Sequence, residues 1–188
     1  KDVFPQYKFK RKEHREESTI DWTEMFRIIN MVRDEIRDNF PYKVMHVHGC
    51  EADDVIAHIA LQTQEFGKHE PVMIVSADKD FIQLQKYDNI KQFSPMTKKF
   101  VKDPNPRLYL MEHIFKGDGG DGVPNILSDD NVFVDGRRQT PVTKKKMDVW
   151  MASDDLRATL GEEIYRNYIR NKKLIDLTET PENVKQEI

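Results

Sequence analysis

The sequence predicts an α/β fold, with a mainly parallel sheet flanked by helices and followed by a mostly helical region. Over residues 21–108, segments with helical apolar spacing alternate with short strand-like segments, which is typical of a parallel sheet with helical crossovers. After about residue 108 the helical spacing continues without a convincing strand. We therefore expect a basic segment at residues 1–20, an α/β core at 21–108 and a helical region at 109–188.

Composition limits the classes of function. The 188 residues contain 30 Lys and Arg and 33 Asp and Glu, so the formal charge is -3. A positive field over the whole protein is excluded, and nucleic-acid binding would need segregated basic groups. A single cysteine excludes a disulfide framework and a cysteine zinc site. No signal peptide or membrane span is expected, and we predict a cytoplasmic protein.

The first expected helix begins near Asp21, where Glu24 completes a capping pair, and Pro41 ends it. Its apolar face contains Trp22, Met25, Phe26, Ile29, Val32 and Ile36. A short strand is predicted at residues 44–48 and a second helix at 52–66. A fully buried strand is predicted at 72–76, and a strand at 90–93 is expected to pair with 99–102.

The later elements are expected to be helices at residues 109–116, 142–152 and 154–171. The first of these runs directly into the loop GDGGDG at residues 117–122. Several aromatic residues occur at helical spacing, and we expect them to be core residues: Trp22, Phe26, Trp150 and Tyr165.

Acidic residues are concentrated in three short segments. They are Glu51, Asp53 and Asp54; Asp78 and Asp80; and Asp118 and Asp121. The first two segments follow predicted strands, and in a parallel sheet such turns share the carboxyl edge. Converging carboxylates repel one another unless a cation neutralises them, and they suit hard ions such as Mg²⁺ or Mn²⁺. Two such ions would favour hydrolysis of phosphodiesters.

Each acidic segment also has a structural interpretation, which the sequence leaves open. Acids in the first turn of the helix at residue 52 can serve as caps, Asp78 and Asp80 can be turn residues, and GDGGDG can be a flexible turn. A calcium loop at residues 78–88 is set aside because its central glycine and closing glutamate are absent. His46 and His48 lack a third ligand, so a structural role is preferred, and Cys50 has no basic partner.

Three segments together resemble the 5′-nuclease superfamily, which is flap endonuclease-like. They are CEADDVIAHIA at residues 50–60, VSADKDFIQL at 75–84 and KGDGGDGV at 116–123. The segments YKFKRKEHREES at 7–18 and QFSPMTKKFVK at 92–102 match the branch of RNase H (5′-3′ exonuclease) from T-even bacteriophages better than the cellular branch. The resemblance covers nearly the whole chain and implies a fold of the PIN and flap endonuclease type.

The resemblance implies roles for particular residues. The acids that it places at two Mg²⁺ or Mn²⁺ ions are Glu51, Asp53, Asp54, Asp78, Asp80, Asp118 and Asp121, of which Glu51, Asp53, Asp78 and Asp80 are the catalytic group. Basic and aromatic residues at the end of a helical arch would bind the 5′ strand: Tyr7, Lys8, Lys10, Arg11 and Arg15. A solvated charged tail is the alternative for that segment.

The sequence departs from the family in two places. The family carries two aspartates on strands upstream of the arch, and neither position lies within these 188 residues, so we expect a missing N-terminal portion. The region after Asp121 lacks the repeated Gly-x-Gly turn that grips duplex phosphates. It keeps basic residues that would bind phosphates, or form a solvated helix face: Arg137, Arg138, Lys144, Lys145 and Lys146.

The resemblance therefore implies a metal-dependent 5′-3′ nuclease that hydrolyses DNA or RNA–DNA duplexes and flaps at the 5′ end, during primer removal in phage DNA replication. Its protein partners would be a single-strand-binding protein or a sliding clamp, without a membrane. The first alternative is a catalytically incomplete fragment that only binds DNA. A related metal-dependent RNase is the second alternative.

Overall fold

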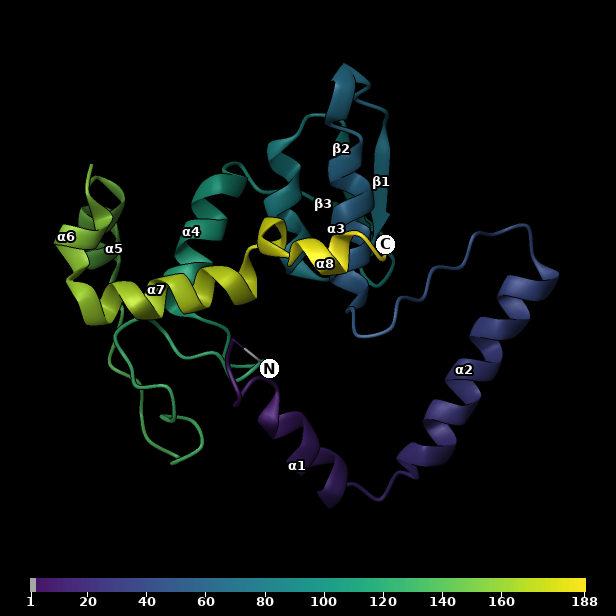
Figure 1. Cartoon of the computed structure of the whole chain (residues 1–188), viewed down its shortest axis with the longest axis horizontal. Helices are drawn as coiled ribbons and strands as arrows, with labels where there is room; N and C mark the ends of the chain where they lie inside the picture. Colours follow the sequence, from purple (N-terminus) through teal and green to yellow (C-terminus); the bar gives the residue numbers. More distant parts are fainter. Residues whose placement is uncertain (1–2) are drawn as a thin grey trace.

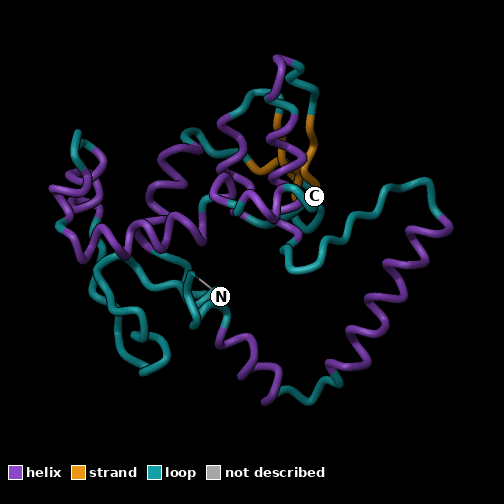
Figure 2. The backbone as a smooth tube through the Cα atoms, viewed as in Figure 1, coloured by secondary structure: helices purple, strands orange, loops and turns teal. Residues whose placement is uncertain are grey.

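The structure, a computed structural model, describes residues 3–188, apart from the side chains of Lys12 and Phe66. The α-helices are α1 (Phe9–Glu17), α2 (Trp22–Asn39), α3 (Ala52–Gln62), α4 (Pro106–Lys116), α5 (Lys144–Met151), α6 (Leu156–Leu160), α7 (Glu162–Ile175) and α8 (Glu182–Lys185). The 3-10 helices are η1 (Glu65–Gly67), η2 (Lys79–Lys86) and η3 (Leu177–Glu179), and the strands are β1 (Val72–Val75), β2 (Ile90–Ser94) and β3 (Lys99–Val101). Figures 1 and 2 show their arrangement.

The α/β class is confirmed, and the sheet is mixed. Strand β1 pairs with β2 in parallel, with Val72 opposite Ile90, and β2 pairs with β3 antiparallel, with Phe93 opposite Phe100. The prediction of a fully buried strand at residues 72–76 is wrong, because Val75 is 64% exposed and only Ile74 is buried. One face of β1 is uncovered, so an apolar run here does not mean burial on both faces.

Two hydrophobic clusters hold the molecule together. The first joins α3, β1, η2 and β2 through Ala57, Ala60, Ile74, Phe81, Leu84 and Ile90. The second joins α4, the loop at residues 123–126 and α5–α7 through Ile114, Phe115, Val123, Ile126, Met147, Trp150, Leu160, Tyr168 and Ile175. Buried Gln83 links them, because its amide donates to the Ile175 carbonyl (3.0 Å) and accepts from the Leu177 N–H (2.9 Å).

Residues 9–50 form an arch that stands away from both clusters (Figure 1). The arch contains α1, α2 and the extended connection back to α3. Helix α2 begins as predicted, since Asp21 accepts a hydrogen bond from the Glu24 N–H (3.0 Å), but it buries none of its residues. The prediction that Trp22 and Phe26 are core is therefore wrong: Trp22 is partly exposed and Phe26 is 46% exposed.

Several predicted boundaries also change. The strand expected at residues 44–48 does not form: residues 44–47 have no regular secondary structure, His48 lies in a turn, and none of them has a ladder partner among residues 3–188. The helix expected at 52–66 ends at Gln62, and that expected at 154–171 is divided at Gly161, which has a φ of +75°. Trp150 is buried and Tyr165 packs against the second cluster, as expected. Over residues 3–188, the helices are too short or too polar to cross a bilayer.

Candidate functional site

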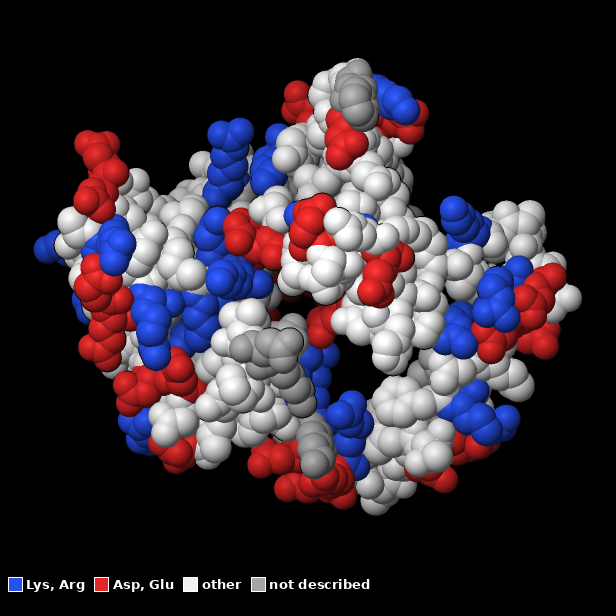
Figure 3. Space-filling model, viewed as in Figure 1, with Lys and Arg blue, Asp and Glu red and all other residues white. Residues whose placement is uncertain are grey.

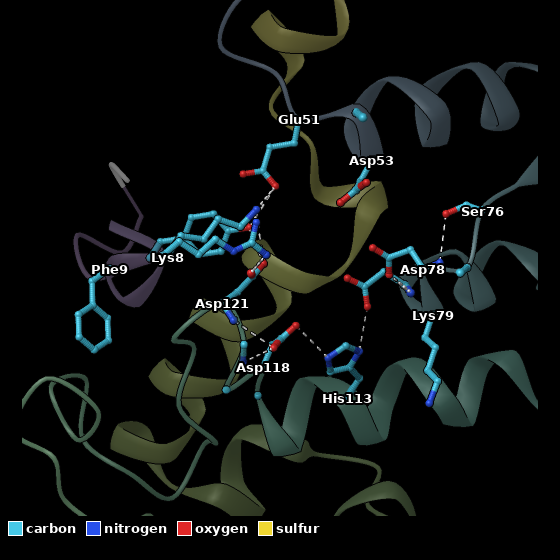
Figure 4. A pocket seen from close by; sticks show the side chains of 18 of the residues that line it. Lys8, Phe9, Glu51, Asp53, Ser76, Asp78, Lys79, His113, Asp118 and Asp121 are labelled. Atoms are coloured by element: carbon cyan, nitrogen blue, oxygen red, sulfur yellow. Dashed lines mark hydrogen bonds and ion pairs between the residues drawn. The ribbon is translucent and has the colours of Figure 1, made fainter. Parts of the chain in front are cut away.

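The three acidic segments meet at one cavity of about 1550 Å³, which lies between α1 and the rest of the chain. Six acidic residues from these segments line it: Glu51 and Asp53 at the start of α3, Asp78 and Asp80 after β1, and Asp118 and Asp121 after α4; Glu13 and Glu16 of α1 line it as well. Figure 4 shows five of these carboxylates directed into the cavity from different sides: Glu51, Asp53, Asp78, Asp118 and Asp121. In Figure 3 an opening lies between the arch and the core, with charged side chains of both signs at its rim. We refer to these six residues as the acidic cluster.

The turn after β1 is fixed by buried Gln92 on the neighbouring strand. Its amide donates to the carbonyls of Ser76 (3.0 Å) and Asp78 (2.6 Å), while the Ser76 hydroxyl accepts from the Asp78 N–H. The Asp78 carboxylate in turn accepts from the Asp80 N–H (3.0 Å), which caps η2. Asp78 and Asp80 are therefore turn residues, and this turn is what places them at the cavity.

The GDGGDG loop has its own geometric requirement. Gly117 has a φ of +67°, and a Cβ atom there would lie 2.4 Å from the Val123 carbonyl oxygen, so only glycine fits. Beyond it, one oxygen of Asp118 accepts from the N–H groups of Gly120 (2.8 Å) and Asp121 (3.2 Å). The second oxygen of Asp118 lies 3.8 Å from Nε2 of His113, at the cavity.

Asp54 differs from the other predicted acids. One of its oxygens accepts from the Glu51 N–H (3.1 Å) at the start of α3, and the other accepts from the Thr180 hydroxyl (3.1 Å). It does not line the main cavity but a smaller adjoining one of about 350 Å³. For this residue the structure supports the capping interpretation that the sequence left open.

Residues just before and within α1 neutralise part of the acidic cluster. Lys8 forms an ion pair with Glu51 and lies 3.5 Å from Asp121, and Arg11 forms an ion pair with Asp121. The Tyr7 hydroxyl donates to Asp121 (3.1 Å) and lies 3.3 Å from Glu51. Burial, with these two carboxylates, raises the pKa of Tyr7, so it remains a donor.

His113 is a member of the site that the sequence did not single out. From α4 it places Nδ1 3.5 Å from Asp80 and Nε2 3.8 Å from Asp118, and its ring lies edge-on to Tyr109. The interaction with Asp118 is the largest cause that raises the pKa of His113. The available signal was its place one turn before the end of a helix that runs directly into the acidic loop.

The pKa values of these carboxylates are shifted in different directions. Burial, and then the charges of Asp78, Asp118 and Asp53, raise the pKa of Asp80 to about 6, although nearby His113 opposes the shift. The interaction with His113 and the two loop N–H donors lower the pKa of Asp118 to about 2. Burial and then Asp78 raise the pKa of Asp53. Ionising all these groups together is unfavourable unless positive charge is supplied.

This donor set fits a hard divalent cation, because carboxylate oxygens dominate it and its crowded charge calls for neutralisation. In the conformation described, however, no three His, Cys, Asp or Glu side chains of residues 3–188 stand close enough to one point to coordinate an ion. Glu51 and Asp121 are instead engaged by Lys8 and Arg11. An ion would thus require side-chain rearrangement within the acidic cluster.

The other predicted basic residues are divided between the cavity and distant surfaces. Arg15 lines the cavity, whereas the Lys10 ammonium lies 5.1 Å from the ring of Phe133. Arg137 pairs with Asp129 and Asp135. The remaining residues are exposed and do not line the cavity: Arg138, Lys144, Lys145 and Lys146.

Comparisons with known proteins agree with the fold. Residues 1–109 match the family model "5′-3′ exonuclease, N-terminal resolvase-like domain", and residues 104–188 match "T4 RNase H, C terminal". The chain is 38% identical to ribonuclease H of Enterobacteria phage T4 over 190 residues, which are 97% of this chain and 61% of that protein. It is 27% identical to a 5′-3′ exonuclease of Buchnera aphidicola over 131 residues, covering 66% and 42% respectively.

Solved structures show the same fold at low identity. A bacteriophage T5 flap endonuclease complex with DNA and metal ions has a TM-score of 0.61 at 17% identity, and zinc-bound T5 5′-exonuclease has one of 0.60 at 18%. Each covers 98% of this chain and 75% of its own. The chain spans about three fifths of the T4 relative and two fifths of the Buchnera relative. Because the exonuclease domain model matches more than half of its length, this chain belongs to the 5′-3′ exonuclease family.

Proposed function

We propose that this chain is the nuclease part of a divalent-metal-dependent 5′-3′ nuclease acting on the 5′ ends of DNA or RNA–DNA duplexes and flaps. The observation that carries the proposal is the convergence of six carboxylates from three distant segments at one cavity. The T4 relative is named a ribonuclease H, and a T5 neighbour is a flap endonuclease solved with DNA and metal ions. Primer removal in phage DNA replication is the role that fits these relatives.

The residues divide into three roles in this proposal. Asp53, Asp78, Asp80 and Asp118 would hold two Mg²⁺ or Mn²⁺ ions, joined by Glu51 and Asp121 once these leave their basic partners. When bound, such ions supply water activation and stabilisation of the leaving oxygen. His113 would keep Asp80 and Asp118 oriented. Lys8, Arg11 and Arg15 would bind phosphates at the cavity.

Outside the cavity, the exposed basic residues are proposed to hold the duplex. Arg138 and the lysine run at residues 144–146 lie on the helical region at 109–188, which we propose as a nucleic-acid-binding region. Point charges of this kind position a phosphate backbone without reading its sequence. Binding would accordingly weaken steeply as salt increases.

Cleavage of a labelled 5′-flap DNA and a 5′-tailed RNA–DNA hybrid in Mg²⁺, with EDTA as the blank, tests the proposal. We expect Asp80→Asn and Asp118→Asn each to slow cleavage at least about 10²-fold, because metal-ion catalysis contributes several kcal/mol to the transition state. The matched control is Asp88→Asn, an exposed aspartate that does not line the cavity and should cleave like the unmodified chain.

The outcomes separate the alternatives. Retention of flap DNA without Mg²⁺-dependent turnover would contradict the nuclease proposal for this chain and favour a DNA-binding module. Preferential degradation of free single-stranded RNA would favour a related RNase. Equal rates for Asp80→Asn and Asp88→Asn would show that the acidic cluster is not the catalytic centre.

A further inference from the structure

The acidic cluster binds the residues at the N-terminal base of the arch, which are Tyr7, Lys8 and Arg11. We refer to these contacts as the fastening of the arch. Lys8 and Arg11 pair with Glu51 and Asp121, and the Tyr7 hydroxyl donates to Asp121. The backbone adds a further contact, because the Lys8 N–H donates to the Asp121 carbonyl (2.8 Å). Figure 4 shows the Lys8 side chain pointing towards the Glu51 carboxylate.

The fastened conformation also holds Lys8 in an uncommon backbone geometry. Lys8 has a φ of 59° and a ψ of 25° at the start of α1. This left-handed region carries a conformational cost for a residue with a Cβ atom. The contacts of its ammonium and N–H with Glu51 and Asp121 offset that cost. Weakening those contacts would therefore favour a change in the first turn of α1.

From these contacts we infer that divalent-cation binding at the acidic cluster and fastening of the arch through Lys8 and Arg11 are mutually exclusive. Both make use of the same oxygens of Glu51 and Asp121, and a cation bound there would repel the Lys8 ammonium. The ion releases Lys8 and Arg11 into a cavity already lined by Arg15 and Lys79, where they become available to phosphates. This inference rests on the proposed function, since it takes the acidic cluster as a metal site.

Such coupling is reciprocal: if a bound ion weakens the contacts of Lys8 and Arg11 with the acidic cluster, those contacts weaken the binding of the ion by the same factor. Removing the Lys8 charge should therefore tighten ion binding. Lys10 provides a matched control, because its ammonium lies against Phe133 and makes no contact with the acidic cluster. Lys10→Met removes the same charge from the same arch and reports any general electrostatic effect.

The test is calorimetric titration of the full chain and its variants with Mg²⁺, in the absence of nucleic acid. We expect Lys8→Met to bind Mg²⁺ on the order of fivefold more tightly than the unmodified chain. Lys10→Met should change the affinity less than Lys8→Met, and Lys8→Arg, which retains the charge, should restore nearly the original value. Circular dichroism of each variant confirms that it is folded.

Hydrogen exchange of the peptide spanning residues 5–17 supplies a second readout that does not depend on catalysis. Adding Mg²⁺ should accelerate exchange in this peptide of the unmodified chain, because the hydrogen bond from Lys8 to Asp121 is lost. In Lys8→Met, exchange should be fast already and respond little to the ion.

Two results would overturn the inference in different ways. Equal Mg²⁺ affinities for the unmodified chain, Lys8→Met and Lys10→Met, with unchanged exchange at residues 5–17, would reject the coupling but leave the metal site intact. Absence of Mg²⁺ binding by the unmodified chain and by Lys8→Met alike would remove the metal site from the proposed function, and the coupling with it.

Discussion

Helices α2 and α7 have similar sequences in one respect and opposite surroundings in the structure. Both are amphipathic, over 18 and 14 residues, yet α2 buries no residue whereas α7 buries Tyr168 and Ile175. Helix α7 packs against α4 and α6 in the second hydrophobic cluster. Helix α2 lies in the arch with Phe26 and Ile29 about half exposed. Apolar periodicity thus identifies which face of a helix can be buried, not whether a partner covers it.

Their polar residues differ in the same way. Asn171 on α7 is fully buried and donates to the carbonyls of Ile114 (2.9 Å) and Pro124 (2.8 Å). On α2 the polar side chains mainly pair along the helix surface, as Arg27 does with Glu24 and Asn39 with Glu35. We therefore expect substitutions in the two helices and their neighbours to differ in cost.

The largest difference is expected between two phenylalanines. Phe115→Ala, in the cluster beneath α7, should lower the free energy of unfolding by about 3–5 kcal/mol, because it leaves a cavity against Trp150 and Tyr168. Phe26→Ala on α2 should change it by less than about 0.5 kcal/mol. Urea denaturation followed by circular dichroism measures both. Similar costs would mean that α2 is packed against something in solution.

A pair of asparagines makes the comparison sharper. Asn171→Ala should cost about 2–3 kcal/mol, because the buried carbonyls of Ile114 and Pro124 each lose a donor and the Arg170 Nε–H loses its acceptor, while Pro124 keeps only its bond from Arg170. Asn39→Ala, at the exposed end of α2, should be nearly neutral. The same denaturation experiment applies, and a neutral Asn171→Ala would show that the carbonyls find other donors.

The acidic cluster lies where the C-terminal end of α4 meets the turn after β1. The raised pKa of Asp80 in this cluster gives a pH-dependent prediction. The pKa of Asp80 is raised to about 6 in the fold, above its usual 3.8, so its contribution to stability is present below 3.8 and is lost as the pH rises through 6. In EDTA, Asp80→Asn should therefore be more stable than the unmodified chain by about 2 kcal/mol at pH 7.5.

This difference should disappear near pH 3.5, where the protonated Asp80 resembles asparagine. Thermal unfolding at both pH values measures it, and Asp88→Asn serves as the exposed control. An Asp80→Asn variant that is less stable at pH 7.5 would mean that the carboxylate is neutralised in the fold more strongly than His113 alone allows.

The smallest effect is expected at the surface of α2. Arg27→Ala removes a bidentate pair with Glu24, at 2.7 Å for each contact, and should barely change the free energy of unfolding, because solvent screens an exposed pair. The cost should fall further in high salt, since both groups are exposed. A larger, salt-independent cost would again indicate that α2 is covered.

The sequence alone predicted features that depend on local or short-range physics. The start of α2 at Asp21, the pairing of the strand at residue 90 with that at 99, and the helix before GDGGDG all follow from caps, turns and periodicity. The sheet-edge argument predicted that at least two acidic segments meet, and the family resemblance added the third, although the strand expected before Glu51 does not form. Those inferences needed no knowledge of what packs against what.

Only the tertiary structure decided what depends on partners distant in sequence. Asp54 is engaged by Thr180, 126 residues away, whereas its neighbour Asp53 lines the cavity. His113 reaches Asp80 and Asp118 because α4 packs on η2, and residues 44–48 form no strand because no ladder partner lies beside them among residues 3–188. Local propensity fixes the form of a segment, but burial and charge pairing depend on neighbours that the chain meets only after folding.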